Sequence, residues 1–251
     1  MSNKKYNGWQ NFPTIQFKEI ISELADAKEE PKALMLIADT GLGKSNAIKA
    51  FTTKKPVNVF VFTLGDSYNL IMLLNEICTA LGIPPYSIGT KNFKCLALRR
   101  ISDKLNELGS EGRSPVIILD ESENARIPVL KFSKELYDAV IENCSIVLIG
   151  TIQLIGQLNK KSQSQSIPQL RRRFKAGTRF ITPFNKVKDM KPFFEAYIPD
   201  QPDVQDLLIQ LCDNYGELHD YLHPFLVHCS KKNIEPTEAA FRLFHKIPKH
   251  K

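Results

Sequence analysis

A run of eight residues, Ala38-Asp39-Thr40-Gly41-Leu42-Gly43-Lys44-Ser45, has the types and spacing of a phosphate-binding loop. Gly41 and Gly43 allow a tight turn, so that successive backbone N–H groups point at one phosphate. Lys44 would reach the β and γ phosphates, and the Ser45 hydroxyl would be a Mg²⁺ ligand. The first glycine of the motif is replaced by Ala38, which is small enough to fit. The motif predicts an ATP and Mg²⁺ site that includes Asp39, Thr40, Gly41, Leu42, Gly43, Lys44 and Ser45.

Two neighbouring carboxylates, Asp120 and Glu121, follow a second apolar run at 116–119, roughly 75 residues after the loop. Ligands of open α/β sheets bind at the carboxyl ends of the strands, where these side chains would emerge. Asp120 suits a role beside the magnesium ion, together with Ser45. Glu121 is placed to polarise an attacking water molecule.

A third apolar run, at 145–149, ends in Gly150 and Thr151. If this strand neighbours the acidic one, the Thr151 hydroxyl would emerge beside Asp120 and Glu121. A threonine at this place also suits the cap of a following helix, and the two roles are compatible.

Strand and helix patterns alternate around these residues and predict an α/β three-layer sandwich with a central parallel sheet. Strands are expected at 33–37, 57–63, 116–119, 145–151 and 179–184, and Thr14 and Ser67 are expected to cap helices. From Asn185 onward the pattern is wholly helical. We therefore expect an N-terminal arm (1–13), an α/β core (14–184), a small all-helical domain (185–245) and a basic tail (246–251).

Composition and charge narrow the class of protein. The chain has 251 residues and a net charge of +7, and no Asp or Glu occurs between Asn143 and Lys188. Such a basic excess predicts a polyanionic partner, and the alternative is an ordinary solvated surface. No apolar run approaches the roughly 20 residues of a membrane helix, so no membrane partner is expected. The N-terminus lacks a signal sequence and the five cysteines are scattered singly, which favours the cytoplasm.

The order of these motifs resembles that of an AAA+ ATPase over residues 14–230, because a glycine loop, an Asp-Glu strand, a Gly-Thr strand, an arginine box and helices follow one another. The Ile-Ile-Leu-Asp-Glu and Val-Leu-Ile-Gly-Thr strands are similar to those of the DNA-transposition regulators MuB and TnsC. The resemblance implies that Thr151 is the sensor-1 residue and that Arg172 or Arg173 is an arginine finger for a neighbouring subunit. His219 stands where many AAA+ lids carry a sensor-2 arginine, which predicts slow hydrolysis or a switch operated by binding.

This resemblance implies an ATP-dependent protein that assembles on double-stranded DNA, as a homo-oligomeric ring or filament, and activates a transposase. Five basic residues along one predicted helix would contact the phosphate backbone without sequence preference, namely Lys91, Lys94, Arg99, Arg100 and Lys104. The alternative for these five residues is a solvated helix face.

Two other functions remain open at this point. One is a helicase loader of the IstB or DnaC kind, which usually needs a further partner-binding arm, and residues 1–13 are short for that role. The other is a signalling or defence switch that binds nucleotide and proteins but not DNA. Salt-dependent binding to duplex DNA would separate this switch from the DNA-assembling transposition regulator described above.

Overall fold

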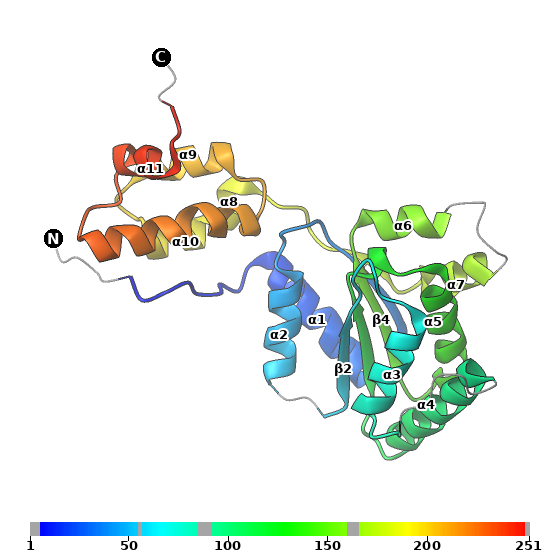
Figure 1. Cartoon of the computed structure of the whole chain (residues 1–251). Coiled ribbons are helices and arrows are strands. Elements are labelled where there is room, and N and C mark those ends of the chain that lie inside the picture. The colour runs from blue at the N-terminus through cyan, green and yellow to red at the C-terminus, as the bar shows by residue number, and fades with distance from the viewer. Residues whose placement is uncertain (1–5, 55–56, 85–91, 160–165, 249–251) are drawn as a thin grey trace. The chain divides into compact units, whose positions relative to one another are not determined.

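The computed structural model describes residues 6–54, 57–84, 92–159 and 166–248 (Figure 1). Residues 1–5 of the expected arm, Lys91 and residues 249–251 of the basic tail lie outside this part. The chain divides into two compact units. One contains Glu19–Asp39 and Ala47–Ile181, and the other contains the N-terminal segment to Lys18, Thr40–Asn46 and Thr182–Lys251. We call them the sheet unit and the helical unit.

The sheet unit is built on five parallel strands in the order β2-β3-β4-β1-β5. Strands β1, β3 and β4 are buried along their whole length, because helices cover both faces of a parallel sheet. The register pairs Ile37 with Gly150 and Thr63 with Asp120, so the carboxyl ends of the strands are level. The strands are β1 Ala33–Ile37, β2 Val59–Thr63, β3 Val116–Asp120, β4 Ser145–Gly150 and β5 Thr178–Phe180.

The helices of the sheet unit lie on both faces of the sheet, which confirms the expected three-layer α/β fold (Figure 1). Apolar residues at helical spacing explain the contact, as in α4, where Ala97, Ile101 and Leu105 are fully buried. They enter one cluster with side chains of β1, β3 and β4. The helices are α1 Ile15–Glu29, α2 Lys44–Thr53, α3 Leu70–Ala80, α4 Phe93–Ser110, α5 Ile127–Val140, α6 Ile152–Asn159 and α7 Ser166–Lys175, and a 3-10 helix, η1, spans Ser122–Asn124.

The helical unit has its own core, to which both ends of the chain contribute. Trp9 of the extended arm stacks on Phe193 and Tyr197, with ring centroids 5.2 Å apart in each pair. The Tyr6 hydroxyl lies 2.5 Å from Nδ1 of His223. The helices after Thr182 in the described chain are α8 Lys186–Tyr197, α9 Pro202–Leu211, α10 Tyr215–Lys232 and α11 Glu238–His245. Among the described residues, no helix is long and apolar enough to cross a membrane.

Two local predictions were wrong. The last strand is shorter than expected, because Ile181 makes one more backbone bond to Ile37 and Pro183 then has no N–H for the ladder. Helix α3 is capped by Asn69, whose side chain accepts hydrogen bonds from the N–H groups of residues 71 and 72, and Ser67 precedes this cap. The cap at Thr14 is confirmed by its bond from the Phe17 N–H.

Candidate nucleotide site

The acidic end of β3 combines a buried carboxylate with an exposed one. Asp120 is 4% exposed, and its Oδ1 accepts a 3.0 Å hydrogen bond from the Glu121 N–H. Glu121 is exposed and has a left-handed backbone, with φ 53° and ψ 40°. Such a conformation is unfavourable for a residue with a Cβ atom, and residues held in it cluster at functional sites. The backbone therefore holds Glu121 at a fixed place beyond the strand end.

Thr151 follows the neighbouring strand. Strands β3 and β4 pair directly, as the prediction for Thr151 required. Thr151 is 8% exposed, and its Oγ1 accepts a 3.3 Å bond from the Gln153 N–H at the start of α6. The Ala38 N–H, just after β1, donates to the Gly150 carbonyl at 2.9 Å. The strand that leads into the glycine loop is thus joined to the strand that ends at Thr151.

The glycine loop has the backbone that its sequence predicts. Gly41 and Gly43 have φ values of 77° and 82°, which side chains with a Cβ rarely adopt. A Cβ on Gly41 would lie 2.2 Å from Oδ1 of Asn214, the residue that caps α10. The Gly41 carbonyl accepts a 3.1 Å bond from the Tyr215 N–H. The loop and the first turn of α10 therefore form one tightly packed structure inside the helical unit.

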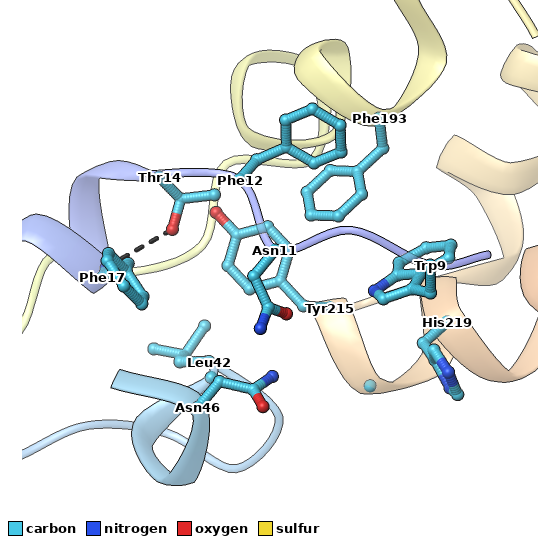
Figure 2. A pocket seen from close by; sticks show the side chains of 12 residues that line it. Trp9, Asn11, Phe12, Thr14, Phe17, Leu42, Asn46, Phe193, Tyr215 and His219 are labelled. Atoms are coloured by element: carbon cyan, nitrogen blue, oxygen red, sulfur yellow. Dashed lines mark hydrogen bonds between the residues drawn. The ribbon is translucent and has the colours of Figure 1, made fainter. Parts of the chain in front are cut away.

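A cavity of about 380 Å³ opens beside this loop within the helical unit, and Figure 2 shows the side chains around it. Its size falls in the range of small-molecule sites. The carboxamides of Asn11 and Asn46 project into it among aromatic rings (Figure 2). The cavity is lined by Trp9, Asn11, Phe12, Thr14, Phe17, Leu42, Gly43, Asn46, Phe193, Tyr215, Gly216 and His219.

Most of this cavity was not predicted from the sequence. His219 was expected where many AAA+ lids carry a sensor-2 arginine, and the structure places His219 in the cavity wall. The contribution of Trp9 and Asn11 from the arm was not expected. The ring of His219 lies edge-on to Trp9 at 5.0 Å, and its Nδ1 lies 3.1 Å from Oδ1 of Asp220. The aromatic residues of the arm were the available signal, but nothing local showed what they contact.

The two arginines of α7 have different surroundings. Arg173 Nε lies 2.7 Å from Oδ1 of Asp138 on α5, and Lys134 Nζ lies 2.9 Å from the other carboxylate oxygen. Burial alone would raise the pKa of Asp138, but the hydrogen bonds from Arg173 and Lys134 prevail and lower it. Arg172 is exposed. Leu170 and Phe174 face the core, and at 3.6 residues per turn Arg172 points to the opposite side.

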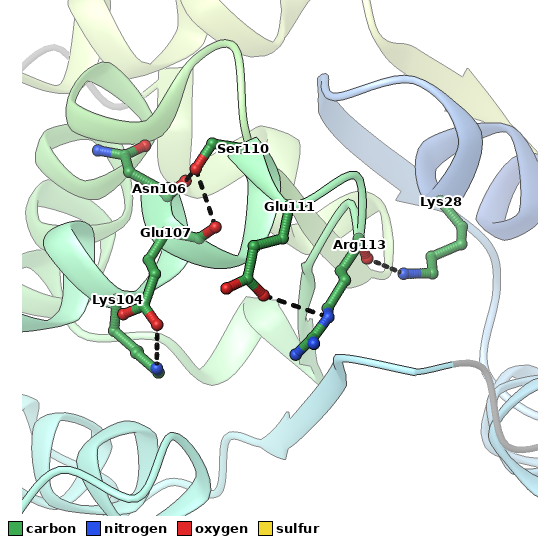
Figure 3. A network of polar contacts seen from close by, with 7 residues as sticks. All are labelled: Lys28, Lys104, Asn106, Glu107, Ser110, Glu111 and Arg113. Carbon is green, nitrogen blue, oxygen red and sulfur yellow. Dashed lines mark hydrogen bonds and ion pairs between the residues drawn. The ribbon is translucent and has the colours of Figure 1, made fainter.

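Three of the predicted DNA contacts lie next to carboxylates. Lys94 is 2.9 Å from Glu135, Lys104 is 2.8 Å from Glu107 (Figure 3), and Arg99 is 3.9 Å from Asp103. The positive charge of α4 is thus partly compensated by the chain itself. Arg100 is exposed on the same helix.

Fold and site together define a P-loop ATPase, since a glycine loop follows a buried parallel strand and an Asp-Glu pair ends a strand of the same sheet. A family model described as an AAA domain matches residues 27–158, just over half of the chain. The chain therefore belongs to the AAA domain family. A search of curated proteins gave no match.

Solved structures confirm the fold. The Walker-type ATPase paby2304 of Pyrococcus abyssi is 18% identical, with a TM-score of 0.60 over 92% of this chain and 71% of that one. The ORC2 protein of Aeropyrum pernix, in its ADP form, is 14% identical, with a TM-score of 0.58 over 100% of this chain and 72% of that one. At these identities the likeness shows a common AAA+ fold.

The residues present fit a nucleotide with its metal ion. Both loop glycines have the positive φ that opens backbone amides toward an anion, and any side chain at Gly41 would collide with Asn214. Asp120 supplies carboxylate oxygens, and Ser45 a hydroxyl, which are ligand types that Mg²⁺ prefers. The cavity beside the loop has aromatic walls that suit a flat base.

Proposed function

We propose that the chain binds ATP with Mg²⁺ and hydrolyses it. The observation that carries the proposal is the pairing of β4 with both β3 and β1. In this sheet Asp120 ends β3, Glu121 follows it and Thr151 follows β4, and the glycine loop comes after β1. This order along one sheet supports a common site.

Each residue of this set has a role in the proposal. Backbone amides of the loop and Lys44 bind the phosphates, and Ser45 and Asp120 would hold Mg²⁺, which neutralises phosphate charge when bound. Glu121 accepts a proton from water while the water oxygen bonds to the γ-phosphorus and the bond to the leaving ADP oxygen breaks. The Thr151 hydroxyl orients that water or a γ-phosphate oxygen.

The cavity of the helical unit would take the base. Trp9, Tyr215 and His219 supply flat rings for stacking. A carboxamide offers one donor and one acceptor side by side, which matches the donor and acceptor of adenine. Asn11 and Asn46 would therefore favour adenine over guanine, whose corresponding edge carries an acceptor in place of the amino group.

Assembly of subunits would complete the site. Arg173 is held by Asp138 within its own chain, so we assign the arginine finger to Arg172, which points away from the core. An arginine supplied by a neighbouring subunit stabilises the charge of the transition state. Hydrolysis would thus be slow in the monomer and faster in a ring or filament.

We propose further that these assemblies form on double-stranded DNA and regulate a transposase or a similar protein partner. The supporting observations are the resemblance in motif order and the basic residues of α4. The ion pair between Arg99 and Asp103 is 81% and 70% exposed at its two side chains. Exposed pairs of this kind contribute little to stability, so a DNA phosphate can replace the carboxylate.

A second candidate is a nucleotide-dependent switch that does not bind DNA. It is favoured by the close pairs of Lys94 with Glu135 and of Lys104 with Glu107, which leave less positive charge for phosphates. Both candidates use the same ATP site.

The experiment that tests the ATP site measures nucleotide affinity and single-turnover hydrolysis of the wild type, Lys44→Ala and Glu121→Gln. We expect Lys44→Ala to lose binding, because phosphate charge is left uncompensated. Glu121→Gln should bind ATP normally and lose turnover, since an amide is not a base. Equal ATP affinity in Lys44→Ala, or equal turnover in Glu121→Gln, would refute the assignment. Competition with GTP in Asn11→Ala then tests the base pocket.

A further inference from the structure

The turn after β3 is fastened to the segment after β2 by two side chains. Nδ2 of Asn124 donates a 2.9 Å hydrogen bond to the Leu64 carbonyl. Arg126 donates a 3.3 Å bond to the Asp66 carbonyl. The Leu64 N–H in turn donates to the Asp120 carbonyl at 3.0 Å. The two segments therefore form one unit immediately around the acidic strand end.

Asn124 makes a second contact that Arg126 does not make. The same Nδ2 lies 3.3 Å from Oε2 of Glu121. An amide nitrogen carries two hydrogens, so one can bond the Leu64 carbonyl while the other bonds the glutamate. Both acceptors require the nitrogen, and this fixes the orientation of the amide.

The contact matters because Glu121 is otherwise exposed. Its backbone is held by the left-handed turn and by the bond from its N–H to Asp120, but an exposed glutamate side chain has several rotamers. Among the described residues, Asn124 is the one whose side chain donates a hydrogen bond to this carboxylate. A bond to Oε2 restricts the rotamer and leaves Oε1 to accept from a water molecule.

We propose that Asn124 is a positioning residue for Glu121, and that it ties the direction of this carboxylate to the backbone at Leu64. The proposal rests on the proposed function, in which Glu121 is the base of ATP hydrolysis. Asn124 itself touches neither the water nor the nucleotide. Its removal should lower kcat without changing ATP affinity, because small misplacements of a reacting group cost rates of up to about a hundredfold.

The test compares single-turnover hydrolysis and ATP affinity of Asn124→Ala with those of the matched control Arg126→Ala. Arg126→Ala removes the neighbouring link to the same segment and leaves Glu121 untouched. We expect kcat to fall about tenfold or more in Asn124→Ala, with unchanged affinity, and to stay near wild type in Arg126→Ala. Equal losses in both variants would show that Asn124 only fastens the loop, and overturn the proposal.

A double-mutant cycle distinguishes a positioning role of Asn124 from a purely structural one. In the Glu121→Gln background, Asn124→Ala should add no further loss of rate, because the group that it positions is already absent. Additive losses would overturn the proposal. If Asn124→Ala does not fold, the isosteric Asn124→Asp replaces it. Its carboxylate would repel Glu121 and raise the pKa of Glu121, so the acidic limb of the rate–pH profile should move to higher pH. An unchanged acidic limb would contradict the proposal.

Failure of the inference and failure of the proposed function give different results. If the wild type hydrolyses ATP, Glu121→Gln does not and Asn124→Ala is unaffected, the inference alone is wrong. If the wild type neither binds nor hydrolyses ATP, the proposed function is wrong and the inference falls with it.

Discussion

Arg173 and Asp138 form an ion pair of 2.7 Å that joins α7 to α5, and the adjacent Arg172 projects to the solvent. Neighbouring arginines thus have opposite surroundings on one helix. Arg173 is held by a carboxylate of its own chain, whereas Arg172 is available to a second molecule. This difference leads directly to the first prediction.

We expect Arg172→Ala to fold normally and to lose assembly-stimulated hydrolysis, by about a thousandfold if it is a full arginine finger. Arg173→Ala should instead lower the unfolding temperature, because Asp138 loses a hydrogen-bonded partner. Thermal unfolding and ATPase rates measured on both variants separate the two effects.

Mixing experiments supply the control. A subunit with Arg172→Ala has an intact P-loop, and one with Lys44→Ala has an intact finger, so mixed assemblies should regain part of the activity. No recovery at concentrations where the two co-assemble would argue for a structural role of the arginine.

The ion pair also predicts a dependence of stability on acid. The pKa of Asp138 is lowered from its ordinary value of 3.8, because the bonds from Arg173 and Lys134 outweigh the effect of burial. The stabilisation is therefore fully present above the unfolded pKa near 4 and is lost as the pH falls through the lower folded value. Urea unfolding at pH 5, 4 and 3 should show a smaller acid loss for Asp138→Asn than for wild type. The control is Asp103→Asn, because Asp103 is 70% exposed in its pair with Arg99. Its loss of stability in acid should match that of the wild type.

Three glycine substitutions should differ in severity. Gly41→Ala combines a positive φ with a collision at Asn214, whereas Gly43→Ala has the strained φ and open space. Left-handed backbone costs a residue with a Cβ about 1–2 kcal/mol, so both variants should lose stability, Gly41→Ala more. Gly156→Ala, in an open position of α6, should be neutral or stabilising by up to about 1 kcal/mol. Chemical denaturation and ATP affinity measure the series, and equal effects at Gly41 and Gly156 would contradict the loop geometry.

Removing acidic partners tests the proposed DNA contacts of α4 more sharply than removing the lysines. Glu107→Gln and Glu135→Gln free Lys104 and Lys94, so both variants should bind duplex DNA more tightly. The plot of log affinity against log salt concentration should become steeper by about 0.9 for each freed cation. Glu195→Gln, which frees Lys191 on α8, is the matched control. If all three variants bind DNA as the wild type does, the switch that does not bind DNA becomes the better description.

Local patterns of sequence predicted the fold well. Unbroken apolar runs identified β1, β3 and β4, because a parallel sheet buried on both faces requires such runs. The glycine loop and the Asp-Glu pair could be predicted because each motif consists of residues that are adjacent in the sequence. The order of the strands, which brings β4 between β1 and β3, confirmed that the strand before Thr151 neighbours the acidic strand.

Contacts between residues far apart in the sequence could not be predicted in this way. Whether Arg172 or Arg173 is free depends on Asp138, which is 35 residues away from Arg173. The cavity beside the glycine loop depends on an arm whose Tyr6 contacts a residue 217 positions later. Single-sequence patterns describe a face of one helix or strand, and these sites are made where several such faces meet.

The arm of the helical unit has a consequence for synthesis of the chain. Residues 6–12 leave the ribosome early, but their partners Phe193, Tyr197 and His223 are made near the end. The Tyr215 hydroxyl, which is also made late, donates a 2.8 Å hydrogen bond to the early residue Gln16. A nascent chain that has already formed the whole sheet therefore lacks the cavity beside the glycine loop. In the proposed function, nucleotide would find a finished pocket only after α10 has emerged. Trp9, the single tryptophan, lines this cavity, so its fluorescence would report that step.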